Sequence, residues 1–326
     1  MDQRRPGMTV PLPGHLHAQR DRLCELADLG YTDIWSAESD GADGFTPLAL
    51  AAAWEPRLRL GTAIIPAYTR APACMAQSAA SLADAAPGRF ALGLGSSSNV
   101  IVERWNGIPF EYPYRRVRDM VRFLREAFAG EKVSRKFDTF EVDGFRLGVR
   151  PEVAPPVLVA ALREQMLAMA GREADGVIIN WLAPEDVPTV ASVVHGAAGG
   201  DAREVVARIF VCPSERADVV REGARRAIAA YMNVPVYAAF QDWLGRGDAL
   251  RPMWEAWAAG DRKGALAVIP DEVVDALVIH GSAEHCRSRI SDYFENGVTT
   301  TSLAILPLDP ELDFFEAVRS LSPSAG

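Results

Sequence analysis

Short apolar runs recur along the chain and alternate with longer segments whose apolar residues fall on one helical face. Each run is almost continuously apolar, which is typical of a parallel strand that is buried on both faces. The runs that predict strands are Met8–Leu12, Thr32–Trp35, Leu58–Ile65, Phe90–Leu94, Pro156–Ala160, Gly176–Asn180, Glu204–Cys212 and Thr299–Ile305.

The segments between these runs predict helices. Proline in the first turn, glycine after the last turn, and N-caps at Ser214 and Ser282 support the boundaries. The stretch 57–98 is the clearest unit, because its two strands flank one crossover helix and should therefore be parallel. The predicted helices are Leu16–Leu29, Thr46–Trp54, Cys74–Ala86, Pro113–Phe128, Glu164–Glu173, Pro184–His195, Ser214–Ala230 and Ala283–Asn296.

Eight strands separated by helices predict an α/β fold, a (β/α)8 TIM barrel. We expect one domain over the 326 residues, with a hairpin insertion at about 131–155 and an aromatic-rich helical insertion at about 231–270. The hairpin is expected within Phe137–Val149, near Asp143-Gly144. An open doubly wound sheet is the alternative, but the first strand–helix junction lacks the glycine-rich dinucleotide signature.

Composition excludes several classes of protein. The net charge of −9 argues against a nucleic-acid surface. The arginines of 113–128 are expected to form a solvated helix face with pairs such as Arg122 and Glu126. The four cysteines are scattered, and no apolar run reaches the ~18 residues that span a bilayer, so we expect a cytoplasmic protein without membrane contact.

A barrel of this kind builds its site where the carboxyl ends of the strands converge. The residues there include no paired carboxylates, no metal-ligand spacing and no nucleophile elbow, so a cofactor is expected to carry the chemistry. The candidates are His15, Glu38, Ser39, Ile64, Ile65, Ser96, Ser97, Ser98, Asn99, Ala160, Ala161, Leu162, Arg163, Asn180, Trp181 and Cys212.

Each candidate also has a purely structural interpretation. Glu38 can simply pair with a basic neighbour, and the serines can serve only a turn. Arg163 can be a surface charge, or it can hold an anion together with the helix N-terminus. The aromatic insertion can pack a core or form a lid over the site.

Four blocks of sequence resemble the bacterial luciferase-like oxidoreductases, and are most similar to the branch that uses the deazaflavin coenzyme F420. The resemblance covers most of 30–182, and flavin-dependent members share the same blocks. The blocks are GYTDIWSAES, LRLGTAIIPAYTRAPACMAQSAASL, GRFALGLGSSSNVIVERWNGIPF and PVLVAALREQMLAMAGREADGVIINWL.

The resemblance implies a barrel with the tricyclic ring of the cofactor in its mouth. Ala63, Ile64 and Ile65 match a segment with a non-prolyl cis peptide that backs the ring, and Glu38 matches an acidic residue near the reactive edge. The remaining cofactor positions implied are Ser39, the ring-lining loop Gly95, Ser96, Ser97, Ser98 and Asn99, the phosphate loop Ala160, Ala161, Leu162, Arg163, Glu164 and Gln165, and the nearby Asn180 and Trp181.

This chain departs from the family pattern at Ser39, at Ser98 and in the phosphate loop, which commonly carries glycine near Arg163. Some deazaflavin dehydrogenases have a catalytic histidine where Ser39 stands and a glutamate where Ser98 stands, so sugar-phosphate dehydrogenase chemistry is not expected. The favoured hypothesis is hydride transfer between F420 and a small organic substrate, with Glu38 as first and His15 as second candidate proton donor. The alternatives are an FMN-dependent monooxygenase and a non-catalytic binding barrel. Family members commonly pair through the 46–54 and 74–86 helices, which implies a homodimer.

Overall fold

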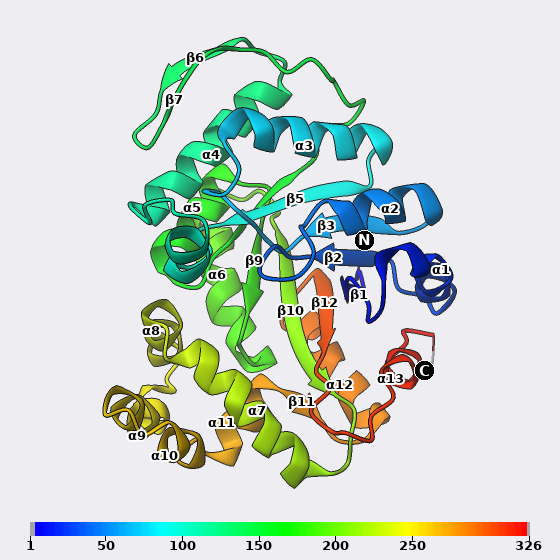
Figure 1. Ribbon diagram of the computed structural model, residues 1–326, viewed down its shortest axis with the longest axis vertical. Coiled ribbons are helices and arrows are strands. Elements are labelled where there is room, and N and C mark those ends of the chain that lie inside the picture. The colour runs from blue at the N-terminus through cyan, green and yellow to red at the C-terminus, as the bar shows by residue number, and fades with distance from the viewer. Residues whose placement is uncertain (1–3, 325–326) are drawn as a thin grey trace.

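The computed structural model describes residues 4–324 and closes the eight predicted strands into one parallel ring (Figure 1). Both β12–β1 and β9–β10 are paired, so the sheet has no break and the predicted TIM barrel is confirmed. Around the ring the strands are β1 (Gly7–Val10), β2 (Asp33–Ser36), β3 (Arg59–Thr62), β5 (Phe90–Gly95), β8 (Val157–Ala160), β9 (Gly176–Asn180), β10 (Glu204–Cys212) and β12 (Thr300–Ile305).

Two strands of the ring face each other across the barrel axis. β3 and β10 are separated by three strands whichever way the ring is followed. Two short strands, β4 (Ile65–Pro66) and β11 (Ile279–His280), extend the sheet beside β5 and β10.

Helices cover the outside of the barrel, as Figure 1 shows, and three short turns at Leu16–Ala18, Val100–Trp105 and Pro184–Asp186 join them to the strands. In the described residues no helix is both long and apolar enough to cross a bilayer. The covering helices are α1 (Arg20–Asp28), α2 (Thr46–Trp54), α3 (Pro72–Ala85), α4 (Pro113–Phe128), α5 (Glu164–Glu173), α6 (Val187–Ala197), α7 (Ala217–Met232), α12 (Ala283–Glu295) and α13 (Phe314–Ser320).

Two further groups of elements lie outside the ring. A hairpin of β6 (Val133–Lys136) and β7 (Glu141–Phe145) follows α4. Four helices, α8 (Pro235–Trp243), α9 (Gly247–Ala258), α10 (Arg262–Ala267) and α11 (Asp271–Leu277), follow α7. They form a second hydrophobic cluster with α7.

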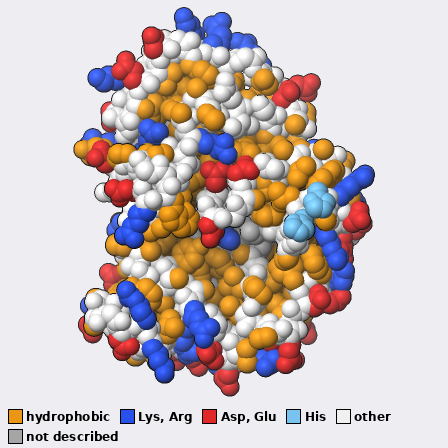
Figure 2. Space-filling model, in the orientation of Figure 1, with side chains coloured by type: hydrophobic (Ala, Val, Ile, Leu, Met, Phe, Trp, Pro, Cys, Tyr) orange, Lys and Arg blue, Asp and Glu red, His pale blue; other side chains and the backbone are white. Residues whose placement is uncertain are grey.

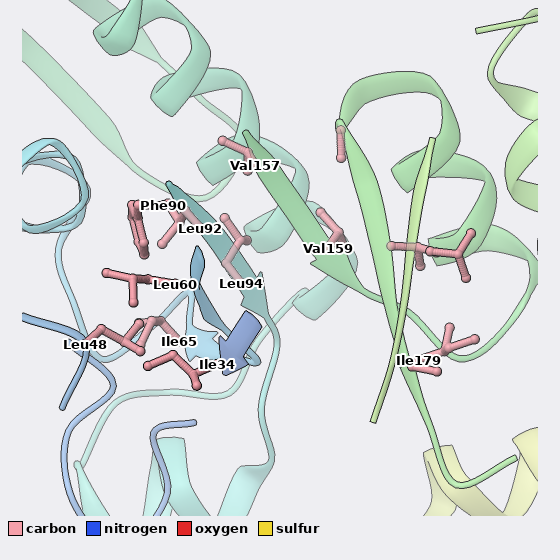
Figure 3. Close-up of a cluster of buried hydrophobic side chains, with 14 of the residues drawn as sticks. Ile34, Leu48, Leu60, Ile65, Phe90, Leu92, Leu94, Val157, Val159 and Ile179 are labelled. Atoms are coloured by element: carbon pink, nitrogen blue, oxygen red, sulfur yellow. The ribbon is translucent and has the colours of Figure 1, made fainter. Parts of the chain in front are cut away.

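Alternate side chains of each strand point outward and inward, as the period of two requires. Figure 3 shows outward-facing residues such as Ile34, Leu60 and Leu92, which belong to the core between strands and helices. Inward-facing residues form a separate cluster in the middle of the barrel. Gly61 makes room for the largest of them, because a Cβ there would lie 2.3 Å from the Trp35 indole. This inner cluster consists of Trp35, Ala91, Leu158, Ile178 and Val206.

The hairpin and one ion pair differ from the prediction. The hairpin turns at 137–140, and Asp143-Gly144 lies inside β7 rather than at the turn. Arg122 pairs with Glu173 of α5 at 2.6 Å, whereas Glu126 pairs with Arg135 of the hairpin. Because α4 packs beside α5 and the hairpin, partners on neighbouring elements replace the local i,i+4 pair.

Two predicted helix starts also differ. The first helix begins only at Arg20, after the separate turn Leu16–Ala18. Ser214 does not cap α7, which begins at Ala217; its hydroxyl instead donates to Asp309 Oδ2 at 2.6 Å. Ser282 does cap its helix, accepting from the His285 backbone N–H at 3.2 Å.

Candidate active site in the barrel mouth

The barrel interior is closed in the middle and open at the carboxyl ends of the strands. Trp35, Leu158 and Val206 in the middle are almost fully buried. One layer higher, Ala160, Asn180 and Arg208 also face the interior, yet each remains partly exposed to solvent. In Figure 2 hydrophobic side chains gather in a hollow near the centre of the face, with charged side chains at its edge. The mouth is therefore accessible to a ligand.

One wall of the mouth is built from small and apolar groups. The Ala63–Ile64 peptide bond is cis, as the resemblance implied. Ala63, Ile64 and Ala160 pack beside the inner cluster and remain partly exposed. A Cβ added at Gly95 would lie 3.0 Å from the Ala160 Cβ and 3.4 Å from Ile64. This wall is thus tightly joined and carries no side chain larger than Ile64, which suits a flat aromatic ligand.

The serine loop follows β5 at the edge of this wall. Ser98 accepts the Ile101 N–H at 3.3 Å and so starts the turn Val100–Trp105, which is the structural role considered for the serines. Ser97 has a φ of 61°, in the left-handed region that non-glycine residues rarely adopt. Ser96 and Ser97 stay partly exposed, and Asn99 is exposed. The loop is therefore available to a ligand through its first residues.

Glu38 lies next to this wall, since its backbone N–H donates to the Ile64 carbonyl at 3.1 Å. Its Oε2 accepts from the Gly44 N–H at 3.2 Å and from Arg70 at 3.0 Å. Among residues 4–324, the one hydrogen-bond partner of its Oε1 is the Thr69 hydroxyl, at 3.3 Å. Burial lowers the pKa of Arg70, but the hydrogen bond and charge of Glu38, together with Cys74, outweigh burial and the net shift is upward. Glu38 therefore has the basic neighbour that the structural interpretation required, and one oxygen that no N–H occupies.

The opposite wall is polar and aromatic, and its central residue is Arg208 on β10. In register, Arg208 is flanked by Asn180 of β9 and Ser302 of β12. Its guanidinium lies 5.2 Å from the Phe210 ring, and its Nε is buried without a hydrogen-bond partner. Burial lowers the pKa of Arg208, and the phenols of Tyr231 and Tyr237 offset part of that shift.

Aromatic side chains complete this wall. Trp181, whose φ is 54°, stacks on Phe210 at 4.0 Å and contacts Tyr231 at 4.8 Å. Tyr237 from α8 packs edge-on against Tyr231 and receives a 3.4 Å hydrogen bond from the Asn180 amide. The aromatic insertion packs a core, as considered, since Trp254 and Trp257 lie in the second hydrophobic cluster, and Tyr237 also contacts Asn180 in the mouth. A lid over the site stays a prediction.

The other predicted site residues are either exposed at the surface or buried in the core. His15 is exposed and stacks on His17 at 5.6 Å, and Ser39 is exposed and bonds to Asp40. Ala161 is buried and Leu162 is partly buried, and both pack in the core behind the wall. Ile65 is fully buried in the outer core. Cys212 at the end of β10 is also fully buried, and burial raises the pKa of its thiol.

The predicted phosphate loop leads into the first turn of α5. Arg163 is the exposed N-cap residue of this helix. Glu164 and Gln165 are exposed and line an open cavity of about 520 Å³ together with Tyr114 and Arg172. The start of α5 therefore has open space beside it, at the surface between α4 and α5.

Sequence reasoning missed Arg70, Arg208 and Phe210, and it named Tyr237 only as one aromatic residue of the insertion. An arginine in the middle of an otherwise apolar run, as in EVVARIFVC, was a signal for Arg208, because an interior strand position rarely carries a charge without a partner. Arg70 gave no such signal, because its ion pair with Glu38 forms only when two loops that are distant in the sequence come into contact.

A closed parallel barrel with an accessible mouth and a small-residue wall is a (β/α)8 barrel that can hold a ligand at the carboxyl ends of its strands. The model of the luciferase-like monooxygenase family matches residues 2–300, and the chain belongs to that family. The resemblance seen in the sequence is therefore confirmed.

Similar proteins are found both among curated sequences and among solved structures. A 5,10-methylenetetrahydromethanopterin reductase of Methanolobus tindarius is 28% identical over 285 residues, covering 83% of this chain and 84% of the relative. The coenzyme F420-dependent tetrahydromethanopterin reductase of Methanopyrus kandleri has a TM-score of 0.80 at 20% identity, covering 99% and 98% of the two chains. An F420-dependent secondary alcohol dehydrogenase, solved with an F420–acetone adduct, has a TM-score of 0.79 at 16% identity, covering 99% of each chain.

Proposed function

We propose that this protein is an oxidoreductase that transfers a hydride between coenzyme F420 and a small organic substrate. The observation that carries the proposal is the small-residue wall of Ala63, Ile64, Gly95 and Ala160, which faces the interior and stays accessible. Family membership and the F420-dependent relatives support it. A bound deazaflavin supplies two-electron hydride chemistry, so the protein has to provide binding, orientation and a proton.

The residues of the mouth divide these tasks. Ala63, Ile64 and Ala160 would hold one face of the ring, and Ser96 and Ser97 its edge. The start of α5, with Arg163 and the free backbone N–H groups of its first turn, would hold a phosphate of the cofactor tail. His15, Ser39, Asn99, Glu164 and Gln165 are exposed around this path and would contribute less.

Glu38 has one oxygen that is suited to carry a proton. The Gly44 N–H and the Arg70 guanidinium can only donate, so Oε2 must accept. The Thr69 hydroxyl can donate or accept, and it can turn to accept from a protonated Oε1. We therefore assign Oε1 of Glu38 as the position of a transferred proton and rank His15 below it, because His15 lies exposed on the loop after β1.

The test is a titration of the purified protein with F420 and, separately, with FMN, followed by absorbance. Anaerobic reduction of F420 is then assayed with a panel of small alcohols, and oxidation of reduced F420 with the matching carbonyl compounds. We expect F420 to bind at least about tenfold more tightly than FMN, a difference of about 1.4 kcal/mol. Tighter FMN binding with oxygen consumption during turnover would instead indicate a flavin monooxygenase.

A substitution in the wall tests the position of the cofactor. Ala160→Leu places a larger side chain in the mouth and is expected to abolish F420 binding with little change in melting temperature, because Ala160 is not part of the packed interior below. Ala258→Leu makes the same change at an exposed position of α9 and should leave binding intact. Unchanged F420 affinity in Ala160→Leu would show that the ring does not lie on this wall.

A further inference from the structure

The barrel contains an interior arginine that no described carboxylate neutralises. Arg208 lies in the mouth layer of β10, and among residues 4–324 its guanidinium has no ion pair or hydrogen bond. Desolvation without a partner is costly for a charged group, and arginine does not release its proton in a protein. An unpaired guanidinium at the open end of the barrel is therefore suited to bind an anion from solution.

The polar neighbours of Arg208 can also donate hydrogen bonds to an anion. Asn180 and Ser302 flank it in register, so three adjacent strands present polar side chains at one level of the mouth. The Tyr237 hydroxyl already accepts a hydrogen bond from Asn180, so its own proton remains available to an acceptor. Arginine, tyrosine and asparagine can all donate here, and no acidic side chain among the described residues competes with an incoming anion.

The position of Arg208 in the barrel indicates that this anion belongs to the substrate and not to the cofactor. β10 lies opposite β3 across the barrel, so Arg208 faces the small-residue wall from the far side of the mouth. A ring seated on Ala63 and Ile64 would turn its free face toward Arg208. We propose that Arg208, with Asn180 and Tyr237, binds a carboxylate of the substrate across from the cofactor; this inference rests on the proposed function.

The chemistry of the site favours a carboxylate over a phosphate. Arg208 is the only basic side chain on this wall among the described residues, and its planar fork matches two oxygens of one carboxylate. A phosphate dianion generally needs more than one cation or a series of backbone N–H groups. The stacked Trp181 and Phe210 beside Arg208 offer an apolar surface for the rest of a small substrate.

The experiment compares charged and neutral probes of the same shape. Benzoate is titrated against benzamide, and acetate against acetamide, at constant ionic strength, into wild-type protein loaded with F420. We expect at least one carboxylate to bind about tenfold or more tightly than its amide, although the net charge of −9 repels anions. Arg208→Gln should remove the preference, and Arg208→Lys should retain part of it.

Several results would overturn the inference. Equal binding of acid and amide by wild type, or an unchanged preference in Arg208→Gln, would show that Arg208 is not an anion subsite. Loss of F420 affinity in Arg208→Gln would assign Arg208 to the cofactor instead. Absence of F420 binding to wild type would refute the proposed function itself, which keeps the two failures distinguishable.

Stability supplies a readout that does not depend on any ligand. Arg208→Met removes an unpartnered charge, so the melting temperature of the ligand-free protein should stay the same or rise. Arg59→Met is the matched control, because Arg59 is also an interior arginine but is held by two carboxylates. A marked fall in the melting temperature of Arg208→Met would mean that Arg208 supports the fold, and the inference would fail.

Discussion

Replacing Arg59 by methionine is expected to destabilise the protein by removing the ion cluster at the amino end of the barrel. Arg59 of β3 donates to Glu204 through two nitrogens, at 2.6 and 2.8 Å, and to Asp33 at 3.1 Å. Thr300 adds a 2.7 Å bond to Glu204. β3 and β10 lie on opposite sides of the ring, so the pair spans the interior and ties the two halves together.

The magnitude follows from the burial of the partners that remain. The side chain of Asp33 is 2% exposed and that of Glu204 is 19% exposed, so neither carboxylate would be well solvated in Arg59→Met. Breaking a buried pair by removing one partner costs about 3–5 kcal/mol. With an unfolding entropy of roughly 2.1 cal/mol/K per residue, 326 residues give ~0.7 kcal/mol/K, so the melting temperature should fall by roughly 4–7 °C.

The assay is thermal unfolding monitored between pH 7 and about pH 4. Burial raises the pKa of Glu204, but the hydrogen bonds from Arg59 and Thr300 and the nearby positive charges together outweigh burial and leave the pKa lowered. Glu204 therefore stabilises wild type above the ordinary glutamate pKa, and this effect is lost on acidification. Burial raises the pKa of Asp33 despite Arg59, so Asp33 acts with the opposite sign. In Arg59→Met both buried carboxylates lack the positive charge of Arg59, and protonating them removes the free-energy cost of a buried unpaired charge.

The gap between wild type and Arg59→Met should therefore narrow as the pH falls. Arg251→Met removes an exposed arginine that pairs with Asp248 on α9 and should leave the melting temperature unchanged at every pH. A shift of less than about 1 °C at pH 7, or a gap that widens toward low pH, would refute the reasoning.

Two further predictions concern the site and the assembly. Glu38→Gln should keep F420 affinity within a few-fold while turnover of any compound active in the F420 assay falls by about 10²–10⁴-fold; an unchanged rate would remove Glu38 from proton transfer. Light scattering at micromolar concentration should give the mass of a homodimer, because α2 and α3 present small exposed residues such as Ala49, Ala53 and Ser81; a monomeric mass would refute this association.

The strands were the most predictable part of the fold. β9 and β10 begin and end where the apolar runs do, because a strand buried on both faces needs apolar residues at every position. The hairpin was placed less well, because its strands lie at the surface and carry charged residues that give little alternation. There the dipeptide Asp143-Gly144 was a misleading local signal.

The candidate site was predictable only along single strands and loops. Glu38, Ile64 and Ser97 could be named because each follows its own strand. Partners from distant segments could not be, since the Glu38–Arg70 pair and the Asn180–Tyr237 bond join residues 32 and 57 positions apart. The same limit applied to Ser214, where a bond to Asp309, 95 positions away, replaced the expected helix cap.

The contrast between Arg59 and Arg208 connects the fold to the proposed activity. Both arginines point into the same barrel. On β10 the interior positions are Glu204, which pairs with Arg59, then Val206 of the inner cluster, and then Arg208. At the closed end the charge is neutralised within the chain, whereas at the open end the described residues leave it without a counter-charge. If the open end binds an anion, the same change to methionine should lower the melting temperature at Arg59 and not at Arg208. Equal losses would mean that both charges serve only the fold.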